Sequence, residues 1–330
     1  MQTITREQLL ETAVSLLNDG TVSCVLGWKK GTFDYDVTPA LFETAEELQN
    51  EFVWGDFCGA NFSKYLLKYT RKCDGKILAF LKPCDTYSFN QLLTEHRFDR
   101  EKVYAVGIPC GGMADIEKVK AFAGDGVTAV ESIGNQLAVT TLYADAPVMV
   151  ETEYVLAERC MNCKSRKHVA YDLLLGEEGE VLDSHRFDEV ESLEKMTPDE
   201  RFAFWQQQLS RCIRCNACRD VCPACTCEKC VFDNPRSGVE NKSPANSFEE
   251  KMFHIIRAFH VAGRCTDCGE CSRVCPQNIP LHLLNRKFIK DINTFYGDYQ
   301  AGAEVGSRAP LTNYTVDDLE PGDVFERGEN

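Results

Sequence analysis

The chain has 330 residues, enough for about two domains of roughly 150 residues each. Its formal net charge of −15 argues against binding to nucleic acid or to an anionic membrane surface, because both attract basic proteins. Such a charge mostly keeps a protein soluble, and docking to a basic patch on a partner is the second interpretation. The hydrophobic content of 44% is ordinary for a protein with a core.

The number of cysteines, 18, is the unusual feature of the composition. The N-terminal sequence predicts an amphipathic helix over 6–17 rather than a signal peptide, because no basic segment precedes a continuous apolar run. No segment approaches the roughly 18 continuous apolar residues of a membrane span. We therefore expect a cytoplasmic protein without a membrane span. In that compartment thiols stay reduced, and grouped cysteines indicate metal or redox chemistry.

Strand-like and helix-like segments alternate in the first part of the chain. Predicted strands cover residues 22–28, 76–81, 102–108 and 127–143, the last with a turn at Gly134-Asn135. Predicted helices cover residues 43–52, 86–96 and 114–123. This order predicts an α/β domain with a partly parallel sheet, which we place at residues 1–195.

A second, α-helical and ferredoxin-like domain is predicted at residues 196–295. Its first helix begins after Thr197, since Pro198 suits the first helical position, and it runs to about Ser210. Another helix ends at Gly263, just before a group of cysteines. Residues 296–330 are rich in glycine, proline and acids. They predict an extended tail that wraps over a partner or stays mobile.

Two runs of four cysteines with identical spacing dominate the second domain. They are Cys212-x2-Cys215-x2-Cys218-x3-Cys222-Pro223 and Cys265-x2-Cys268-x2-Cys271-x3-Cys275-Pro276. In such pairs the fourth cysteine of each run ligates the cluster of the other run. We therefore predict two [4Fe–4S] clusters: cluster I on Cys212, Cys215, Cys218 and Cys275, and cluster II on Cys265, Cys268, Cys271 and Cys222. Structural zinc, the alternative, usually uses two separated C-x2-C pairs and has no need of a third cysteine nearby.

Three further cysteines follow the first run as C-x-C-x2-C, with no matching run elsewhere. They are Cys225, Cys227 and Cys230. Two interpretations stay open. Together with Cys24, Cys58 or Cys73 they hold a fourth cluster, or they are reduced thiols packed beside the other clusters.

Two cysteines of the α/β domain stand at equivalent places. Cys84 follows the strand at 76–81, and Cys110 follows the strand at 102–108. The carboxyl ends of parallel strands share one edge of a sheet, where ligands bind. Cys160-x2-Cys163 supplies two more thiols. These four cysteines are candidate ligands of a third [4Fe–4S] cluster, and buried structural cysteines are the alternative.

A family resemblance supports the third cluster. The span KILAFLKPCDTYSFNQLLTEHRFDREKVYAVGIPC resembles the beta-subunit family of the coenzyme F-420 hydrogenases and formate dehydrogenases. The matching positions are Cys84, Cys110, Cys160, Cys163, Asp172 and Gly176. The run RFAFWQQQLSRCIRC resembles the start of the ferredoxin module in formate-dehydrogenase-like members. The resemblance covers most of residues 20–280 and implies FAD beside the third cluster.

The sequence departs from that family in two places. Many members carry the ferredoxin motif at the amino end, whereas here it follows the α/β domain. The basic run Lys164–His168 replaces an acidic and aromatic pair, which argues against deazaflavin specificity. This run contacts flavin phosphates or a carboxylated substrate, or it is a solvated loop. No dinucleotide-binding fingerprint supports the flavin: the near match at Gly124 follows a helix, and we interpret Gly124 as a helix C-cap.

These observations predict an iron–sulfur, FAD-containing electron-transfer subunit of an anaerobic oxidoreductase complex. It would pass electrons between a two-electron carrier and a partner catalytic subunit, such as a hydrogenase or formate dehydrogenase, and a flavin is the usual converter between the two. A flavin-free iron–sulfur relay is the second interpretation, and a redox-sensing or scaffold protein the third. No catalytic residue is predicted, and we expect His254 and His260 on a helix surface or in the core.

Overall fold

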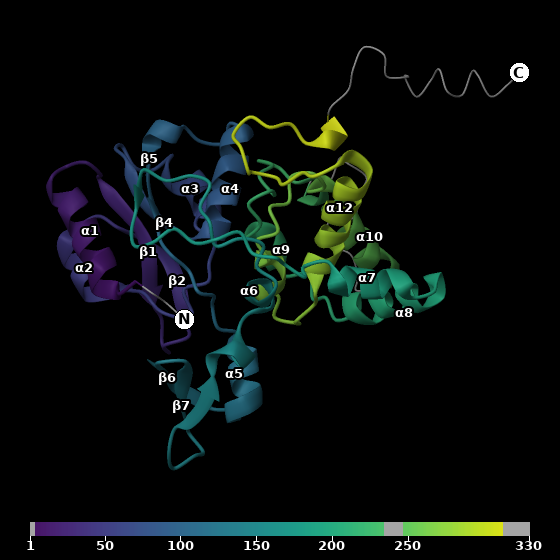
Figure 1. Cartoon of the computed structure of the whole chain (residues 1–330), viewed down its shortest axis with the longest axis horizontal. Coiled ribbons are helices and arrows are strands. Elements are labelled where there is room, and N and C mark those ends of the chain that lie inside the picture. Colours follow the sequence, from purple (N-terminus) through teal and green to yellow (C-terminus); the bar gives the residue numbers. More distant parts are fainter. Residues whose placement is uncertain (1–3, 234–246, 313–330) are drawn as a thin grey trace, which may run out of the picture.

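The computed structural model describes residues 4–233 and 247–312 (Figure 1). Three parts are visible: a mixed α/β region, a small antiparallel sheet that projects from it, and a cysteine-rich region beside it. In the part of the chain that is described, no helix is both long and apolar enough to cross a membrane. The predicted domain boundaries at residues 195 and 295 stay predictions.

A mixed sheet forms the centre of the α/β region, in the order β2-β1-β4-β5-β9 with β3 also paired to β1. The parallel neighbours are β1 (Cys24–Lys30), β4 (Ile77–Leu81), β5 (Val103–Gly107) and β9 (Leu173–Leu174). Two strands, β2 (Val37–Phe42) and β3 (Phe52–Val53), run antiparallel to β1. All residues of β4 are buried, as expected for a strand covered on both faces. The predicted α/β region with a partly parallel sheet is confirmed.

Four helices accompany this sheet: α1 (Arg6–Asn18), α2 (Ala45–Glu51), α3 (Ser63–Tyr69) and α4 (Pro83–Thr94). Capping boxes of Thr5 with Gln8 and of Thr44 with Glu47 begin α1 and α2. Helix α4 begins before the predicted residue 86, because proline suits a first turn, where its missing N–H costs no hydrogen bond. The first turn of α4 therefore carries Cys84.

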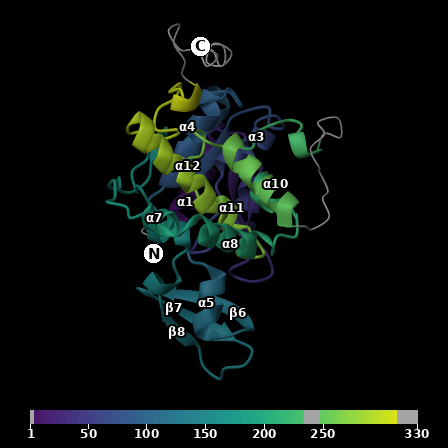
Figure 2. The ribbon, with the colours of Figure 1, turned by 90° about the vertical axis from the view of Figure 1, so that its right-hand side faces the viewer.

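A small antiparallel sheet of β6 (Val127–Ile133), β7 (Gln136–Thr141) and β8 (Val148–Glu151) packs against α5 (Ile116–Ala123). Figure 2 shows this unit projecting from the rest of the molecule. The predicted turn joins β6 to β7, and Gly134 has the positive φ, 61°, that such hairpins favour. Gly124 caps α5 at a φ of 89°, so the predicted helix end is confirmed.

The cysteine-rich region contains α7 (Asp188–Lys195), α8 (Pro198–Leu209), α9 (Ala217–Asp220), α10 (Ser247–His260), α11 (Glu270–Arg273) and α12 (Leu281–Tyr296). Thr197 caps α8 in a capping box with Glu200, where the sequence predicts a helix start. Helices α10 and α12 pack against each other (Figure 2). Helix α12 was not predicted from the sequence, although its apolar residues recur at helical spacing.

The described part of the predicted tail lies against this chain itself. Tyr299 donates from its hydroxyl to the Gly263 carbonyl at 2.9 Å, and the Gly306 N–H donates to Thr94 Oγ1 of α4 at 2.9 Å. Gly302 passes so close to the Tyr87 carbonyl that a side chain there would clash with it. Up to residue 312 the segment therefore lies against α4 and is not a mobile tail. Residues 313–330 lie outside the described residues.

Candidate iron–sulfur centres

The two cysteine runs follow the same backbone path. Arg214 and Asn216 in the first run have φ angles of 53° and 63°, and their equivalents Asp267 and Gly269 in the second have 58° and 67°. Left-handed residues are uncommon outside glycine, so their recurrence at matched positions indicates two copies of one loop. Each loop leads into a one-turn helix, α9 or α11, that carries the third cysteine of its run.

The cysteines predicted for cluster I lie together. One cavity is lined by Cys212, Cys215, Cys218 and Cys275. Burial raises the pKa of Cys218 to about 12, with the neighbouring thiols of Cys271, Cys212 and Cys275 contributing to this rise and Arg257 opposing it. Converging buried thiols become thiolates together only when a metal supplies positive charge. The donor set therefore fits a thiolate-bound cluster.

His254 of α10 lines the same cavity. It is 1% exposed, and neither ring nitrogen has a hydrogen-bond partner among the described residues. Burial, together with the charges of Arg257 and Arg214, lowers its pKa to about 3, so the imidazole is neutral with one N–H to donate. Sulfur atoms in the cavity would accept that N–H, and buried polar groups usually have such a partner.

The cysteines predicted for cluster II also lie near one another. Burial raises the pKa of three of them, and Cys222 adds to each shift; the three are Cys265, Cys268 and Cys271. The Asn285 amide donates to Cys271 Sγ at 3.6 Å. The fourth cysteine of the first run thus lies with the first three of the second, which is the exchange that the spacing predicts. The ligand assignments themselves stay predictions.

A third group of cysteines lines a cavity at the carboxyl edge of the parallel strands. Its thiols are those of Cys84, Cys110, Cys160 and Cys163. Cys84 lies in the first turn of α4 after β4, Cys110 in the loop after β5, and Cys160 in the short helix α6 (Glu158–Met161). Burial raises the pKa of Cys110 to about 12. Cys268 and Asp267 of the second cysteine run line the same cavity, so this group adjoins the cluster II cysteines.

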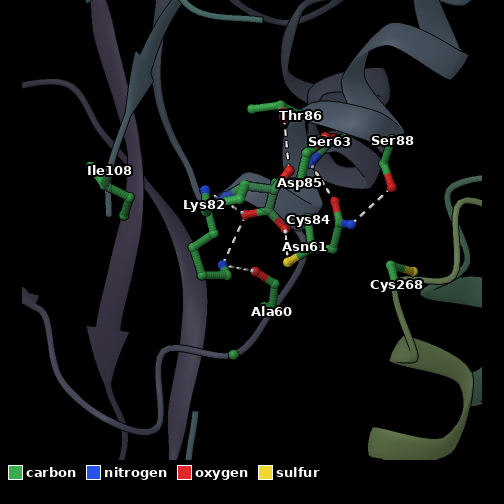
Figure 3. A network of polar contacts seen from close by, with 12 residues as sticks. Ala60, Asn61, Ser63, Lys82, Cys84, Asp85, Thr86, Ser88, Ile108 and Cys268 are labelled. Carbon is green, nitrogen blue, oxygen red and sulfur yellow. Dashed lines mark hydrogen bonds and ion pairs between the residues drawn. The ribbon is translucent and has the colours of Figure 1, made fainter. Parts of the chain in front are cut away.

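A buried polar network fixes the start of α4 beside this cavity (Figure 3). The Lys82 ammonium lies 2.9 Å from the Asp85 carboxylate and donates to the Ala60 carbonyl at 2.8 Å. Burial alone would lower the pKa of Lys82, but Asp85 and Cys84 raise it, so the lysine stays charged. Ser63 Oγ donates to the Asp85 carbonyl at 2.7 Å. The network places a fixed positive charge next to the four thiols.

Arg159 connects the third cysteine group to the second cysteine run. Its guanidinium donates to the carbonyls of Cys268 at 3.1 Å and Gly59 at 2.5 Å, and it pairs with the Glu270 carboxylate. Against the effect of burial, Arg273 and Arg159 lower the pKa of Glu270 to about 2, so the carboxylate is charged although it is fully buried. These contacts fix the position of the cysteine-rich region on the α/β region.

The basic run Lys164–His168 is built into the fold at both ends. Lys164 donates to the Thr266 carbonyl and lies 4.0 Å from the Tyr87 ring centre. His168 is buried between the Ile108 carbonyl at 3.0 Å and Glu178 at 2.8 Å. Only Arg166 and Lys167 are exposed. Neither predicted role, a phosphate-binding run or a solvated loop, describes the whole segment.

Asp172, a position of the family resemblance, has a structural role. Its carboxylate accepts from the Ala105 N–H at 2.7 Å and pairs with Arg100 at 2.7 Å. These contacts attach β9 to β5. Gly176, the other such position, has a φ of 75° and lies against Pro109. Both residues therefore shape the loop beside Cys110.

The remaining cysteines lie in three places: a neighbouring pair, one core position and the trailing segment. Cys24 and Cys73 are neighbours, since the Cys73 thiol adds to the burial that raises the pKa of Cys24. Cys58 is buried in the core with its thiol 3.9 Å from the Val53 carbonyl. The trailing cysteines line a separate cavity: Cys225, Cys227 and Cys230. Within residues 4–233 and 247–312, no group of His, Cys, Asp or Glu side chains is set for a single metal ion. The cysteine sulfurs that bind a four-iron cube lie farther apart than ligands that share a single metal ion.

The chain is similar to known iron–sulfur and oxidoreductase proteins. Residues 208–279 match the 4Fe-4S dicluster domain. The chain is 24% identical over 359 residues to the F420-dependent formate dehydrogenase subunit beta of Methanocaldococcus jannaschii, covering 90% of this chain and 92% of that protein. It is also 24% identical over 360 residues to the F420-dependent formate dehydrogenase 1 subunit beta of Methanococcus maripaludis, covering 89% and 92%.

A chain of the F420-reducing [NiFe] hydrogenase complex from Methanosarcina barkeri is 14% identical, with a TM-score of 0.35, and the match covers 60% of this chain and 81% of that one. The family resemblance inferred from the cysteine motifs is confirmed by the two beta subunits. A C-terminal 4Fe–4S ferredoxin-like domain is confirmed by the dicluster match.

Replacing Glu270 tests the contact between the two regions. We expect Glu270→Gln to lower the free energy of unfolding by about 3–5 kcal/mol, because Arg159 is left buried without its counter-charge. Arg273→Gln is the matched control: its side chain is 33% exposed and Arg159 keeps its partner, so we expect a loss below about 1 kcal/mol. Denaturant unfolding of samples with equal iron content measures both. Equal losses would contradict this role of the buried pair.

Replacing His254 tests its predicted hydrogen bond to cluster I. The donor stabilises the more negative, reduced form, so we expect His254→Phe to lower the midpoint potential of one cluster. His185→Phe is the control, since its side chain is 77% exposed. A redox titration followed by electron paramagnetic resonance measures the potentials. Unchanged potentials in His254→Phe would show that the imidazole does not donate to the cluster.

Proposed function

We propose that this relative of the F420-dependent formate dehydrogenase beta subunits is an electron-transfer subunit of an oxidoreductase complex. It would hold clusters I and II on the eight ferredoxin cysteines and a third [4Fe–4S] cluster on Cys84, Cys110, Cys160 and Cys163. Electrons would pass along these clusters between a two-electron carrier and a catalytic partner subunit. The complex would be a soluble, anaerobic one.

One observation carries this proposal: two cysteine groups meet in one cavity. Cys268 of the cluster II set lines the cavity of the third group, and Arg159 bridges the two by hydrogen bonds. Cys218 of the cluster I set is in turn close enough to Cys271 for their charges to interact. The three groups therefore form a continuous series from the α/β region into the ferredoxin-like domain, as an electron relay requires.

A flavin would supply the conversion between one-electron and two-electron transfer. A cavity of about 630 Å³ borders Cys275 and Arg159, within the usual size range of ligand sites. Tyr35 and Phe57 offer aromatic surface there, and Arg273 offers a cation. These residues fit a flavin in size and chemistry, and we place the proposed FAD in this cavity. A relay without flavin is the second candidate, because no dinucleotide fingerprint is present in the sequence.

Cysteine replacement tests the third cluster. In protein purified without oxygen, we expect Cys84→Ala to lower the iron content by about four atoms per chain, because one four-iron cluster is lost. Cys73→Ala is the control, since Cys73 lies outside the cysteine cavities described above. Iron and acid-labile sulfide per chain are measured. Unchanged iron in Cys84→Ala would make Cys84 a structural residue.

The same preparations decide between the two candidate functions. If FAD is bound, denaturation should release about one flavin per chain, measured by fluorescence and chromatography. We expect Tyr35→Ala with Phe57→Ala to lower this ratio while the iron content stays unchanged. A wild-type protein with full iron and no flavin would favour the flavin-free relay.

A further inference from the structure

The trailing cysteines share one cavity outside the three groups described above. It measures about 390 Å³, and Cys225, Cys227 and Cys230 all line it. The segment lies between α9 and the short helical turn at Val231–Asp233, without regular structure of its own. Cys227 is exposed, and the other two are half-buried. Tight packing of reduced thiols therefore does not explain Cys227, and the cavity is many times the roughly 30 Å³ that one water occupies in the liquid.

Basic side chains enter this cavity from separate elements. They are Lys64, Arg219, Arg257 and Arg264. Two of them already have carboxylate partners, since Arg219 pairs with Asp233 at 2.8 Å and Arg264 with Glu95 at 2.6 Å. The charges of the other two, Lys64 and Arg257, have no acidic partner in an ion pair among the described residues.

Lys64 and Arg257 bring positive charge to this cavity as well as to the adjoining cluster II cysteine Cys222. Lys64 of α3 donates to the Cys225 carbonyl at 2.5 Å. Arg257 of α10 is 4% exposed and donates to the Cys218 carbonyl at 2.9 Å, while its Nε has no hydrogen-bond partner in residues 4–233 and 247–312. A buried guanidinium normally satisfies its donors. Three thiolates around a metal cluster would supply both the negative charge and the sulfur acceptors.

We propose that Cys225, Cys227 and Cys230 bind a fourth iron–sulfur cluster through three protein thiolates in this cavity. The predicted fourth ligands from the α/β region, Cys24, Cys58 and Cys73, do not line this cavity, so the proposal does without them. Three thiolates suit a three-iron cluster, or a four-iron cluster whose remaining iron takes a carboxylate or solvent ligand. Among the carboxylates that line the cavity, Glu228 has no ion pair with a described residue and is the candidate for this ligand.

The site adjoins the cluster II cysteines. The Cys225 and Cys222 thiols are hydrogen-bonded to each other, so the cavity begins where the predicted cluster II ends. An occupant would therefore exchange electrons with cluster II. The proposal concerns the ferredoxin-like domain only and does not rest on the flavin, on the third cluster or on a partner subunit.

The experiment compares the full chain with a variant that lacks two of the three thiols. Wild type, Cys227→Ala with Cys230→Ala, and the control Cys73→Ala are purified without oxygen, and iron, sulfide and zinc are measured per chain. We expect the double variant to lose about three to four irons and a matching amount of sulfide. The paramagnetic signals of the two ferredoxin clusters should remain. Unchanged iron, or the loss of one zinc in place of iron, overturns the proposal.

A second measurement needs no variant. Cys227 is exposed, and a free thiol there would react with iodoacetamide. We expect its alkylation in the iron-loaded wild type, followed by mass spectrometry, to be at least about tenfold slower than after iron removal by a chelator. Rapid alkylation of Cys227 with no loss of iron overturns the proposal.

Discussion

The buried Glu270 carboxylate is the interaction on which the arrangement of this molecule depends. It lies between two arginines from different parts of the chain: Arg159 from the α/β region and Arg273 from its own helix. The charge of this unexposed carboxylate is offset by the guanidinium groups, and the buried Arg159 depends on the carboxylate in turn. This ion pair also positions Cys160 and Cys268, because Arg159 precedes Cys160 in the sequence and donates to the Cys268 carbonyl. The attachment of the cysteine-rich region to the α/β region therefore depends on the Arg159–Glu270 ion pair. The spacing between the proposed third cluster and cluster II depends on the same pair.

The distribution of positive charge follows the cysteines although the chain is strongly acidic. Lys82 and Arg159 lie beside the third cysteine group, and Arg257 lies among cysteines of the ferredoxin-like domain. The side chains of Lys82, Arg159 and Arg257 are all buried, so water and salt screen their charges little. Lys82 and Arg159 also pair with the buried carboxylates of Asp85 and Glu270, whereas Arg257 has no such carboxylate among the described ion pairs and offsets the charge of thiolates.

Much of this could be predicted from the sequence because the signals are local. The spacing of each cysteine run predicts which thiols share a cluster, and the Thr197 pattern indicates where a helix begins. The positions of Cys84 and Cys110 after two parallel strands follow from sheet geometry alone. The resemblance to the beta subunits and the dicluster domain are both confirmed.

The missed features depend on contacts between distant residues. The burial of Lys164, the contact of the C-terminal segment with α4 and the pairing of Arg159 with Glu270 involve partners far along the chain, which periodicity does not reveal. Asp172 matched a family motif, yet its role in attaching β9 to β5 emerges only from the sheet. The same holds for His254, whose helix position is predictable but whose orientation toward a cavity is not.

Arg257 has a consequence for the energetics of the relay. Burial opposes its charge, but Cys222, Cys271, Cys218 and Cys225 all act on it, and these belong to three different cysteine groups. A single positive charge at this place would raise the potentials of all three clusters in the same direction. The differences in midpoint potential between neighbouring clusters drive each electron step. These differences would then change less than the difference in potential between the clusters and an external donor. One arginine would therefore shift the potentials of the three sites in the ferredoxin-like domain together, without creating a barrier among them.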